Sequence, residues 1–384
     1  MTNRERTLAI LNYESYDRIP IIHFGFWGAT LEKWADEGHV TREEVKDWFA
    51  GHQSSKSIHD KLGFDAPWAY PFYLNTSLSP MFKPEVVEEL PNGSSKVRSR
   101  EGMLQLVKSG VESIPSDLDP LLKGRKEWEE HYLPRLQFHE GRIKSTKIWT
   151  GDESVKFKEG GSDFLEKKER DTCYALYCGS LLGNVRNFLG FQGSIFLLAD
   201  DEALYDEIID TVGELCYRCV EWSLNSGAHF DFAHFWEDIC FNGGPIISPL
   251  VFEAKMGPWY KRITDLLNAH GIEIVSLDCD GKIDALVPIW FNNGVNTMFP
   301  IEVGTWKASI EPWRKEHGKG LRGIGGMNKT LFACDHAAID VEIERLRPLV
   351  DLGGYIPCPD HVIPPDAEWD NVRYYCDRMR AVFG

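Results

Sequence analysis

No stretch of this sequence approaches the run of about 18 apolar residues that a membrane span needs. The first residues, MTNRERTLAILNYESYDRIP, contain no apolar segment of the signal-peptide kind. Positive charge is scarce, because 42 lysines and arginines stand against 59 aspartates and glutamates, a net charge of -17. Such a chain repels phosphate backbones and anionic lipids, so we expect neither nucleic acid nor a membrane as a partner. Its nine cysteines lack the density of a disulfide scaffold, which predicts a cytoplasmic protein with reduced thiols.

Familiar catalytic loops are missing as well. The sequence has no GxxxxGK[ST] phosphate loop, no GxSxG nucleophile turn and no HExxH zinc motif. No GxGxxG follows the first strand-like segment, which disfavours a dinucleotide-binding fold. Any chemistry must therefore be sought in less regular arrangements of polar residues.

Strand-like and helical segments alternate from about residue 170 onward, without a long linker. The expected strands are 19–28, 175–183, 229–240, 272–281, 295–304, 321–329 and 354–361, and the expected helices are 200–227, 248–271, 282–294, 335–354 and 365–384. This alternation predicts a parallel sheet with helices outside. Together with the length, it favours an α/β fold with a single (β/α)8 TIM barrel over residues 1–384.

Two features precede the regular part of the chain. Leu8, Ile10 and Leu11 share one face of an expected N-terminal helix. Residues 85–108 have strand-like runs on both sides of Asn92-Gly93, and Asn-Gly is a strong hairpin signal. We expect an inserted, solvated β-hairpin here. It would serve as a lid or as a dimer contact, so a homodimer stays an open alternative.

Polar side chains gather where the expected strands end. They are Cys178, His234, Glu237, Asp238, Asp278, Asp280, Glu302, Asn328, Lys329, Asp360 and His361. In a barrel, the carboxyl ends of the strands converge on the face where active sites are built. We therefore expect these side chains to share one pocket.

Asp278 and Asp280 stand out among these residues. Side chains alternate along a strand, so Val275 and Leu277 would face the helices while Ser276 and Asp278 face the barrel axis. Asp280 has the same parity as Asp278 and is expected on the same side. The alternative is that Asp280 caps the next helix by accepting backbone N–H groups.

The other candidates carry alternatives too. His361, in PCPDHVIPP, is expected to be a ligand or a proton carrier, with a structural role as the alternative and Cys358 as a rival ligand. Glu237 and Asp238 cannot both face the axis of an extended strand, so one of them is expected to reach the pocket.

Further side chains are expected around a substrate pocket. They are His23, Trp27, His234, Glu302 and Cys358. The first half of the chain is rich in aromatic residues, which in barrel loops line flat apolar pockets or else pack into the core.

Four segments, in order, carry a resemblance to a known family. They are TNRERTLAILNYESYDRIPI, GGPIISPLVFE, DCDGKIDALVPIWFNNGVNTMFPIEVG and GGYIPCPDHVIPP. In this order they resemble the uroporphyrinogen decarboxylase superfamily, over nearly the whole chain. The resemblance implies a (β/α)8 barrel with its active site at the carboxyl-terminal mouth.

The resemblance favours one branch of that superfamily. Porphyrinogen decarboxylases carry an arginine-rich MRQAGR-like stretch after the first strand, where this chain reads HFGFWGATLEKW. The chain looks more like the cobalamin-dependent methyltransferases, some of which bind zinc through an HxCG motif and a distant cysteine. Matching that glycine to Gly281 places Asp278 at the histidine and Asp280 at the cysteine. His361 then matches the distant cysteine, with Cys358 as the alternative.

This ligand set, as the resemblance implies it, predicts a divalent metal, first of all zinc, and an oxygen-bearing substrate. Two carboxylates and a histidine are harder ligands than thiolates, which favours a methoxylated, aromatic methyl donor over a thiol acceptor. Glu237 would be a fourth ligand or a general acid. The chain lacks a DxHxxG corrinoid-ligand motif, so the corrinoid (cobalamin) would arrive on a separate corrinoid-binding protein.

Two other functions stay open at this point. The chain could decarboxylate a small acid, with Asp278 or Asp280 stabilising a protonated intermediate and Lys329 holding the carboxylate. It could also be a non-catalytic barrel that binds a tetrapyrrole or a small molecule, since a fold alone never fixes function.

Overall fold

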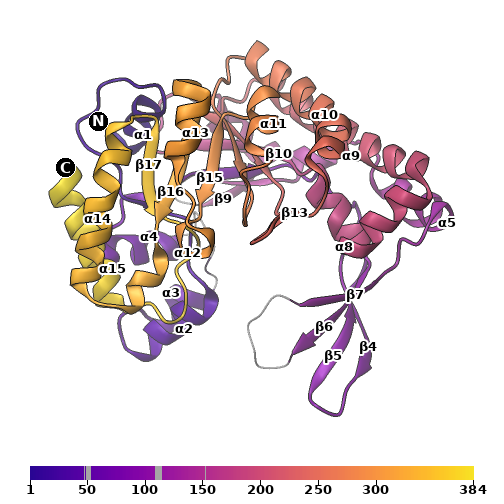
Figure 1. The fold of residues 1–384 in the computed structure, drawn as a ribbon, viewed down its shortest axis with the longest axis horizontal. Helices are drawn as coiled ribbons and strands as arrows, with labels where there is room; N and C mark the ends of the chain where they lie inside the picture. Colours follow the sequence, from indigo (N-terminus) through magenta and orange to yellow (C-terminus); the bar gives the residue numbers. More distant parts are fainter. Residues whose placement is uncertain (47, 49–52, 109–114, 152) are drawn as a thin grey trace.

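A seven-stranded parallel sheet forms the centre of the computed structural model, which describes residues 1–46, 48, 53–108, 115–151 and 153–384 (Figure 1). Its order is β17-β16-β15-β14-β11-β10-β3. The strands are β3 (Tyr70–Tyr73), β10 (Tyr174–Gly179), β11 (Phe232–Trp236), β14 (Val275–Asp278), β15 (Thr297–Ile301), β16 (Arg322–Met327) and β17 (Tyr355–Pro359). Every neighbouring pair is parallel, as the alternation in the sequence predicts.

Helices connect these strands and pack on one side of the sheet (Figure 1). They are α8 (Leu182–Asp200), α9 (Glu202–Leu224), α10 (Pro249–Ala269), α11 (Val287–Asn292), α12 (Val303–Trp306), α13 (Ile310–His317), α14 (His336–Asp351) and α15 (Trp369–Phe383). Strands and helices enclose a core of apolar side chains, of which Trp290 and Phe232 are among the largest that are fully buried. No helix in the described part of the chain is both long and apolar enough to span a membrane.

The N-terminal part lies against the free edge of the sheet beyond β17. It contains α1 (Asn3–Leu11), β1 (Ile22–His23), α2 (Gly28–Asp36), α3 (Arg42–Lys46), α4 (Gln53–Leu62) and β2 (Ala66–Pro67). β1 pairs in parallel with β2, and an isolated parallel bridge joins Phe26 to Ile363, just after β17. This arrangement is compatible with a TIM-barrel-like fold.

A second sheet projects from the body (Figure 1). It is antiparallel and consists of β4 (Glu85–Glu89), β5 (Ser94–Arg98), β6 (Met103–Lys108) and β7 (Ser116–Pro120). The first three strands occupy the segment expected to form a hairpin, and β7 adds a fourth. All five residues of β4 are exposed, and the sheet touches the body through α8.

Short elements fill the remaining connections. They are α5 (Arg125–Glu127), α6 (Gly141–Lys144), α7 (Gly161–Glu166), and the two-stranded pairs β8 (Lys147–Trp149) with β9 (Ser154–Lys156) and β12 (Cys240–Phe241) with β13 (Gly244–Pro245).

Two helices differ from the sequence-based expectation. Helix α8 was not expected, because its glycines, Gly183, Gly190 and Gly193, weaken the helical signal. The helix expected over 282–294 begins only at Val287; before it, the N–H groups of Gly281 and Lys282 donate to the Glu302 carboxylate and the Phe241 carbonyl.

Candidate active site

Three carboxylates meet at the carboxyl ends of β11 and β14. Asp238, Asp278 and Asp280 each bring one oxygen within 4.8 Å of the others. The neighbouring parallel strands β11 and β14 end together, since Trp236 lies opposite Asp278. The Asp280 backbone N–H donates to Asp238 Oδ1 at 3.2 Å, which fixes the second loop against the first.

His361 and Glu302 complete this acidic cluster. His361 Nε2 lies 3.0 Å from Asp280 Oδ2, although 81 residues separate the two in the sequence. Glu302, at the end of β15, accepts the Gly281 N–H at 2.6 Å through Oε2. The structure therefore brings together the predicted residues Asp278, Asp280, Glu302 and His361.

Asp360 holds the strand ends around the cluster. Its Oδ2 accepts the N–H groups of Val303 and Gly304 at 2.8 and 2.7 Å, and its Oδ1 accepts the Lys329 N–H at 3.0 Å. One buried carboxylate thus ties the ends of β15, β16 and β17 together and positions His361 next to it.

Crowding of these carboxylates changes their acidity. Burial, followed by the charges of Asp238 and Asp280, raises the pKa of Asp278 well above its usual range. Burial and the charge of Asp280 also raise the pKa of Asp238 and of Glu302. In each case burial and neighbouring negative charge disfavour the ionised form more than the nearby positive charge favours it.

The cluster fits a divalent cation. Asp280 Oδ1 and His361 Nδ1 are both buried without a hydrogen-bond partner among the described residues. Carboxylate oxygens and an imidazole nitrogen suit zinc and other divalent ions, and a cation would compensate the repulsion among the carboxylates.

The structure contradicts the expected role of Glu237. Its side chain is fully buried on the helix side of β11, where Oε1 accepts from the Leu181 N–H and the Tyr260 hydroxyl. Its Oε2 accepts from the Gly183 N–H and the Ser180 hydroxyl. Three of these bonds anchor the start of α8 and the fourth joins Glu237 to α10, while Asp238 takes the place at the cluster.

Two residues expected around the pocket, Cys358 and Trp27, lie elsewhere. His23 does line the aromatic cavity, with Nε2 2.7 Å from His59 Nε2, and its neighbour Phe24 contacts His361 at 5.2 Å between ring centroids. Cys358 is completely buried near Tyr375 of α15, so His361 and not Cys358 lies at the cluster. Trp27 caps α2 and does not line the cavity.

An aromatic cavity of about 90 Å³ lies beside the cluster. Its lining includes Phe24, Trp68, Tyr73, His234, Asp278 and Phe299. The rings of Trp68 and Phe299 stack at 5.5 Å, and that of Phe24 meets Phe299 edge-on at 4.6 Å. Aromatic rings form much of the cavity lining, and Asp278 adds an acidic group to it.

Lys329 is a cation near the cluster. Burial lowers its pKa, while the charges of Asp360, Glu302 and Asp280 act in the opposite direction. Lys329 therefore compensates several carboxylates at once.

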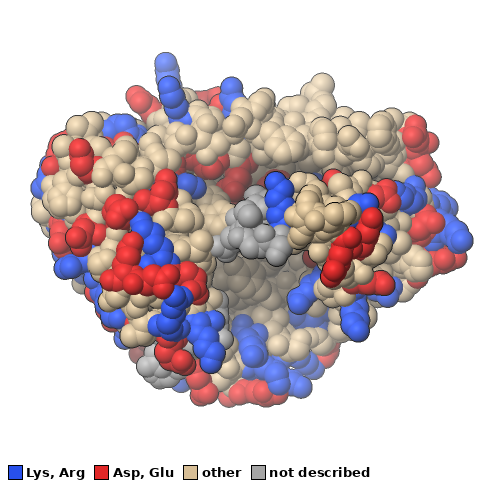
Figure 2. All heavy atoms as spheres, turned by 90° about the horizontal axis from the view of Figure 1, so that it is seen from below, with Lys and Arg blue, Asp and Glu red and all other residues tan. Residues whose placement is uncertain are grey.

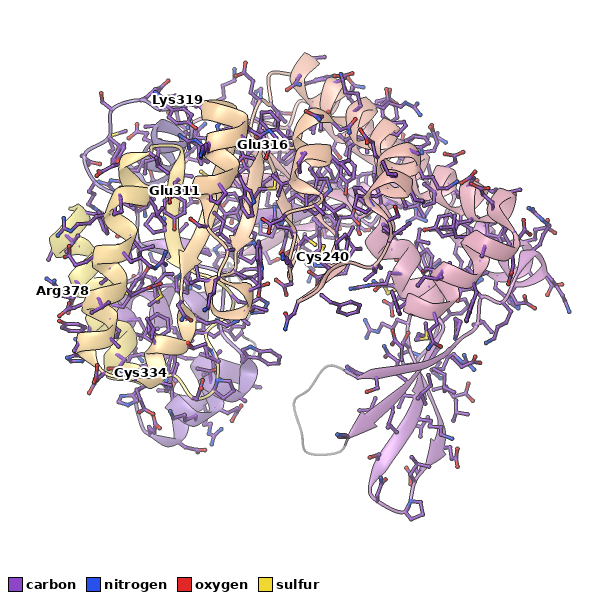
Figure 3. All side chains as sticks on the ribbon, in the orientation of Figure 1. Cys240, Glu311, Glu316, Lys319, Cys334 and Arg378 are labelled. Carbon is purple, nitrogen blue, oxygen red and sulfur yellow. The ribbon has the colours of Figure 1, made fainter. Side chains whose placement is uncertain are left out.

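The site opens onto the face to which the strand ends point. Seen from below, this face is hollowed (Figure 2). Cys240, on the short hairpin that follows Asp238, lies at the inner edge of the hollow (Figure 3).

Sequence reasoning preferred Glu237 to Asp238 as the acid at the cluster, and it missed Phe24 and Phe299 in the aromatic wall. Trp68 and Tyr73 belong to the aromatic-rich first half, which was expected to line a flat apolar pocket or to pack into the core. Strand alternation gave no signal for Asp238, since its left-handed backbone (φ 50°) breaks the alternation.

Comparisons with known proteins bear on the fold. No family model matches the chain, and no curated protein matches its sequence. Solved structures do match, among them a methyltransferase from Methanosarcina mazei, with a TM-score of 0.62 and 15% sequence identity over 99% of each chain. At this identity the likeness shows the fold, and the function has to be argued from the site.

Proposed function

We propose that the chain is a metal-dependent methyltransferase that takes a methyl group from a small methoxylated aromatic donor. The acceptor would be a corrinoid on a separate protein. The observation that carries the proposal is the cluster of Asp238, Asp278, Asp280 and His361 beside a cavity lined by aromatic side chains. Similarity in fold to a solved methyltransferase is compatible with it.

Asp238, Asp278, Asp280 and His361 would hold the divalent cation, with zinc as the first candidate. When bound, the cation would act as a Lewis acid toward the ether oxygen and make the phenolate a better leaving group. The methyl–oxygen bond would break with its electron pair left on oxygen, the methyl group would pass to cobalt(I) of the acceptor corrinoid, which supplies the electron pair of the new bond, and the phenolate would take up a proton.

The chain's own residues would bind and orient the donor. Phe24, Trp68, Tyr73 and Phe299 line the cavity and would surround an aromatic ring with aromatic side chains. Asp278 places its carboxylate in the lining of the same cavity, so the methoxy group would point to the cluster.

The open face supports delivery of the acceptor by a partner. We propose that β1 and β2 complete a closed (β/α)8 barrel within one domain, with the corrinoid protein docking over the hollow in Figure 2. A homodimer stays a prediction.

The two alternative functions find less support in the geometry. Lys329 faces three carboxylates, which compete with any substrate carboxylate in a decarboxylase. A cavity of about 90 Å³ is small for a tetrapyrrole, because pockets for much smaller, drug-sized ligands already measure roughly 300–1,000 Å³.

The test measures methyl transfer from a methoxyphenol to reduced cobalamin, which is monitored through the change in cobalt absorbance. We expect transfer by the metal-loaded protein and a loss of at least about 100-fold in Asp280→Ala, since even outer-shell changes at metal sites cost about 10–100-fold. Glu253→Gln, at an exposed position on α10, is the control. Transfer that is indifferent to Asp280→Ala would contradict the proposal.

A further inference from the structure

His234 is a residue of strand β11, and it lines the aromatic cavity. Its ring centroid is 6.2 Å from that of Trp68 and 6.0 Å from that of Phe299. Unlike the carboxylates, it takes no part in the acidic cluster. Its only polar contact with another side chain in the described part of the chain is with Ser276, on the neighbouring strand β14.

Two hydrogen bonds fix which nitrogen of His234 carries the proton. The Ser276 hydroxyl donates to the Ala233 carbonyl at 3.1 Å, and Ser276 is completely buried. A serine hydroxyl has one hydrogen, and with that hydrogen on the Ala233 carbonyl we assign Ser276 Oγ as the acceptor of the His234 Nδ1–H, 2.8 Å away. The proton of the neutral ring therefore sits on Nδ1, and Nε2 carries a lone pair.

That lone pair faces accessible space. Burial lowers the pKa of His234 to about 4, so the ring is neutral at physiological pH. Nε2 receives no hydrogen bond from any residue that the structure describes, and it is not among the atoms shut off from solvent. His234 lines the cavity, so its acceptor is available to a bound molecule.

We propose that His234 Nε2 accepts a hydrogen bond from a hydroxyl group on the substrate ring. This inference rests on the proposed function and narrows it, because the methyl donor becomes a methoxyphenol with a free hydroxyl rather than a simple aryl ether. A carboxylate in that place would have no hydrogen to donate and would face the charge of Asp278 in the same cavity. His234 is then a specificity-determining residue, and the cluster remains the place of bond cleavage.

The free-energy cost of leaving a buried acceptor without a hydrogen bond determines how strongly the site should discriminate between ligands with and without a hydroxyl group. A ligand that leaves such a group without a partner loses the full cost of its desolvation, whereas one that donates to it does not. Sites built to bind a substrate hydroxyl therefore reject analogues that lack it. We expect the protein to prefer a methoxyphenol over methoxybenzene by about tenfold or more.

Calorimetric titration of the metal-loaded protein tests this preference. The probes are 2-, 3- and 4-methoxyphenol, with methoxybenzene as the matched analogue that lacks the hydroxyl. The wild-type protein should bind at least one methoxyphenol isomer about tenfold more tightly than methoxybenzene. In His234→Phe this preference should vanish because methoxyphenol binds more weakly, while the binding of methoxybenzene stays unchanged. Equal binding of all four probes, or an unchanged preference in His234→Phe, would overturn the inference.

Nitrogen NMR of protein labelled with 15N-histidine tests the tautomer without any ligand. The His234 signals, assigned by their loss in His234→Phe, should show the proton on Nδ1. In Ser276→Ala, which removes the acceptor, that preference should weaken. A proton on Nε2 in the wild-type protein would overturn the inference. Neither measurement requires methyl transfer. If the protein transfers no methyl group, the calorimetric and NMR results for His234 can still be obtained. If those results contradict the role of His234, methyl transfer can still be observed.

Discussion

Glu237 and Asp238 are neighbours in the sequence, yet their carboxylates act on opposite sides of β11. Glu237 accepts four hydrogen bonds behind the strand. Asp238 turns into the left-handed region, with φ 50°, and joins the cluster. The left-handed backbone at Asp238 therefore directs its carboxylate to the cluster, where it would bind a cation, whereas the Glu237 carboxylate stabilises the fold behind the strand.

Matched amide substitutions separate these roles. In Glu237→Gln an amide NH2 replaces one accepting oxygen and faces buried donors, so we expect a loss of about 2 kcal/mol or more in the free energy of unfolding. Its metal content should stay unchanged. In Asp238→Asn, metal content should fall, while the metal-free protein keeps its stability, because Asn Oδ1 can still accept the Asp280 N–H. Denaturant unfolding and elemental analysis give both quantities, and the reverse pattern would refute this assignment.

The raised pKa of Asp278 predicts how the metal-free protein responds to pH. A carboxyl whose folded-state pKa lies above its unfolded value binds protons more tightly when folded. Its stabilising contribution is complete below about pH 4 and is lost as pH rises through the folded-state pKa. Asp278→Asn removes this dependence. After chelation, melting temperatures from pH 5 to 8 should fall more steeply for the wild-type protein than for Asp278→Asn, and parallel curves would argue against buried repulsion.

At the scale of elements, helix α8 connects the body to the projecting sheet and contains a kink. Gly190 has φ 68° and ψ 174°, a conformation that is essentially restricted to glycine, and an added Cβ would lie 3.0 Å from Met103 Cε. Gly193, three residues later, has ordinary helical geometry, with the nearest side-chain atom 3.4 Å from an added Cβ.

Alanine at these two positions should have opposite effects. Gly190→Ala should lower the free energy of unfolding by about 1–3 kcal/mol through backbone strain. Gly193→Ala should leave it unchanged or raise it by up to about 1 kcal/mol, since alanine favours the helix. Chemical denaturation of both variants checks the pair, and a stabilising Gly190→Ala would show that the kink is not required.

The elements also show how much could be predicted from the sequence. The alternation of strand-like and helical segments predicted most of the fold: helices α9 and α10 begin at Glu202 and Pro249, close to the expected starts at residues 200 and 248. The alternation of side chains along a strand placed Asp278 and Asp280 at one site. It failed at Asp238, where the strand is no longer extended, and at Glu237, whose partners come from α8 and α10. Tertiary partners of this kind leave no periodic signal in the sequence.

On the scale of the whole molecule, the site depends on the order of the parallel strands. Asp238 and Asp278 come from adjacent strands, whereas His361 follows the strand at the far edge of the sheet and still reaches Asp280. Asp360 explains how, because it ties the ends of β15 and β16 to the segment that carries His361. A cation at this point would also stabilise the arrangement by binding only the folded chain.

Elemental analysis of the purified protein tests the cation site most directly. The wild-type protein and the Glu253→Gln control should each carry about one equivalent of a divalent metal, zinc as the first candidate, while Asp280→Ala and His361→Ala lose most of it. Circular dichroism would confirm that the variants are folded. Equal metal content in all four proteins, or none in the wild-type protein after growth with added metals, would contradict the site.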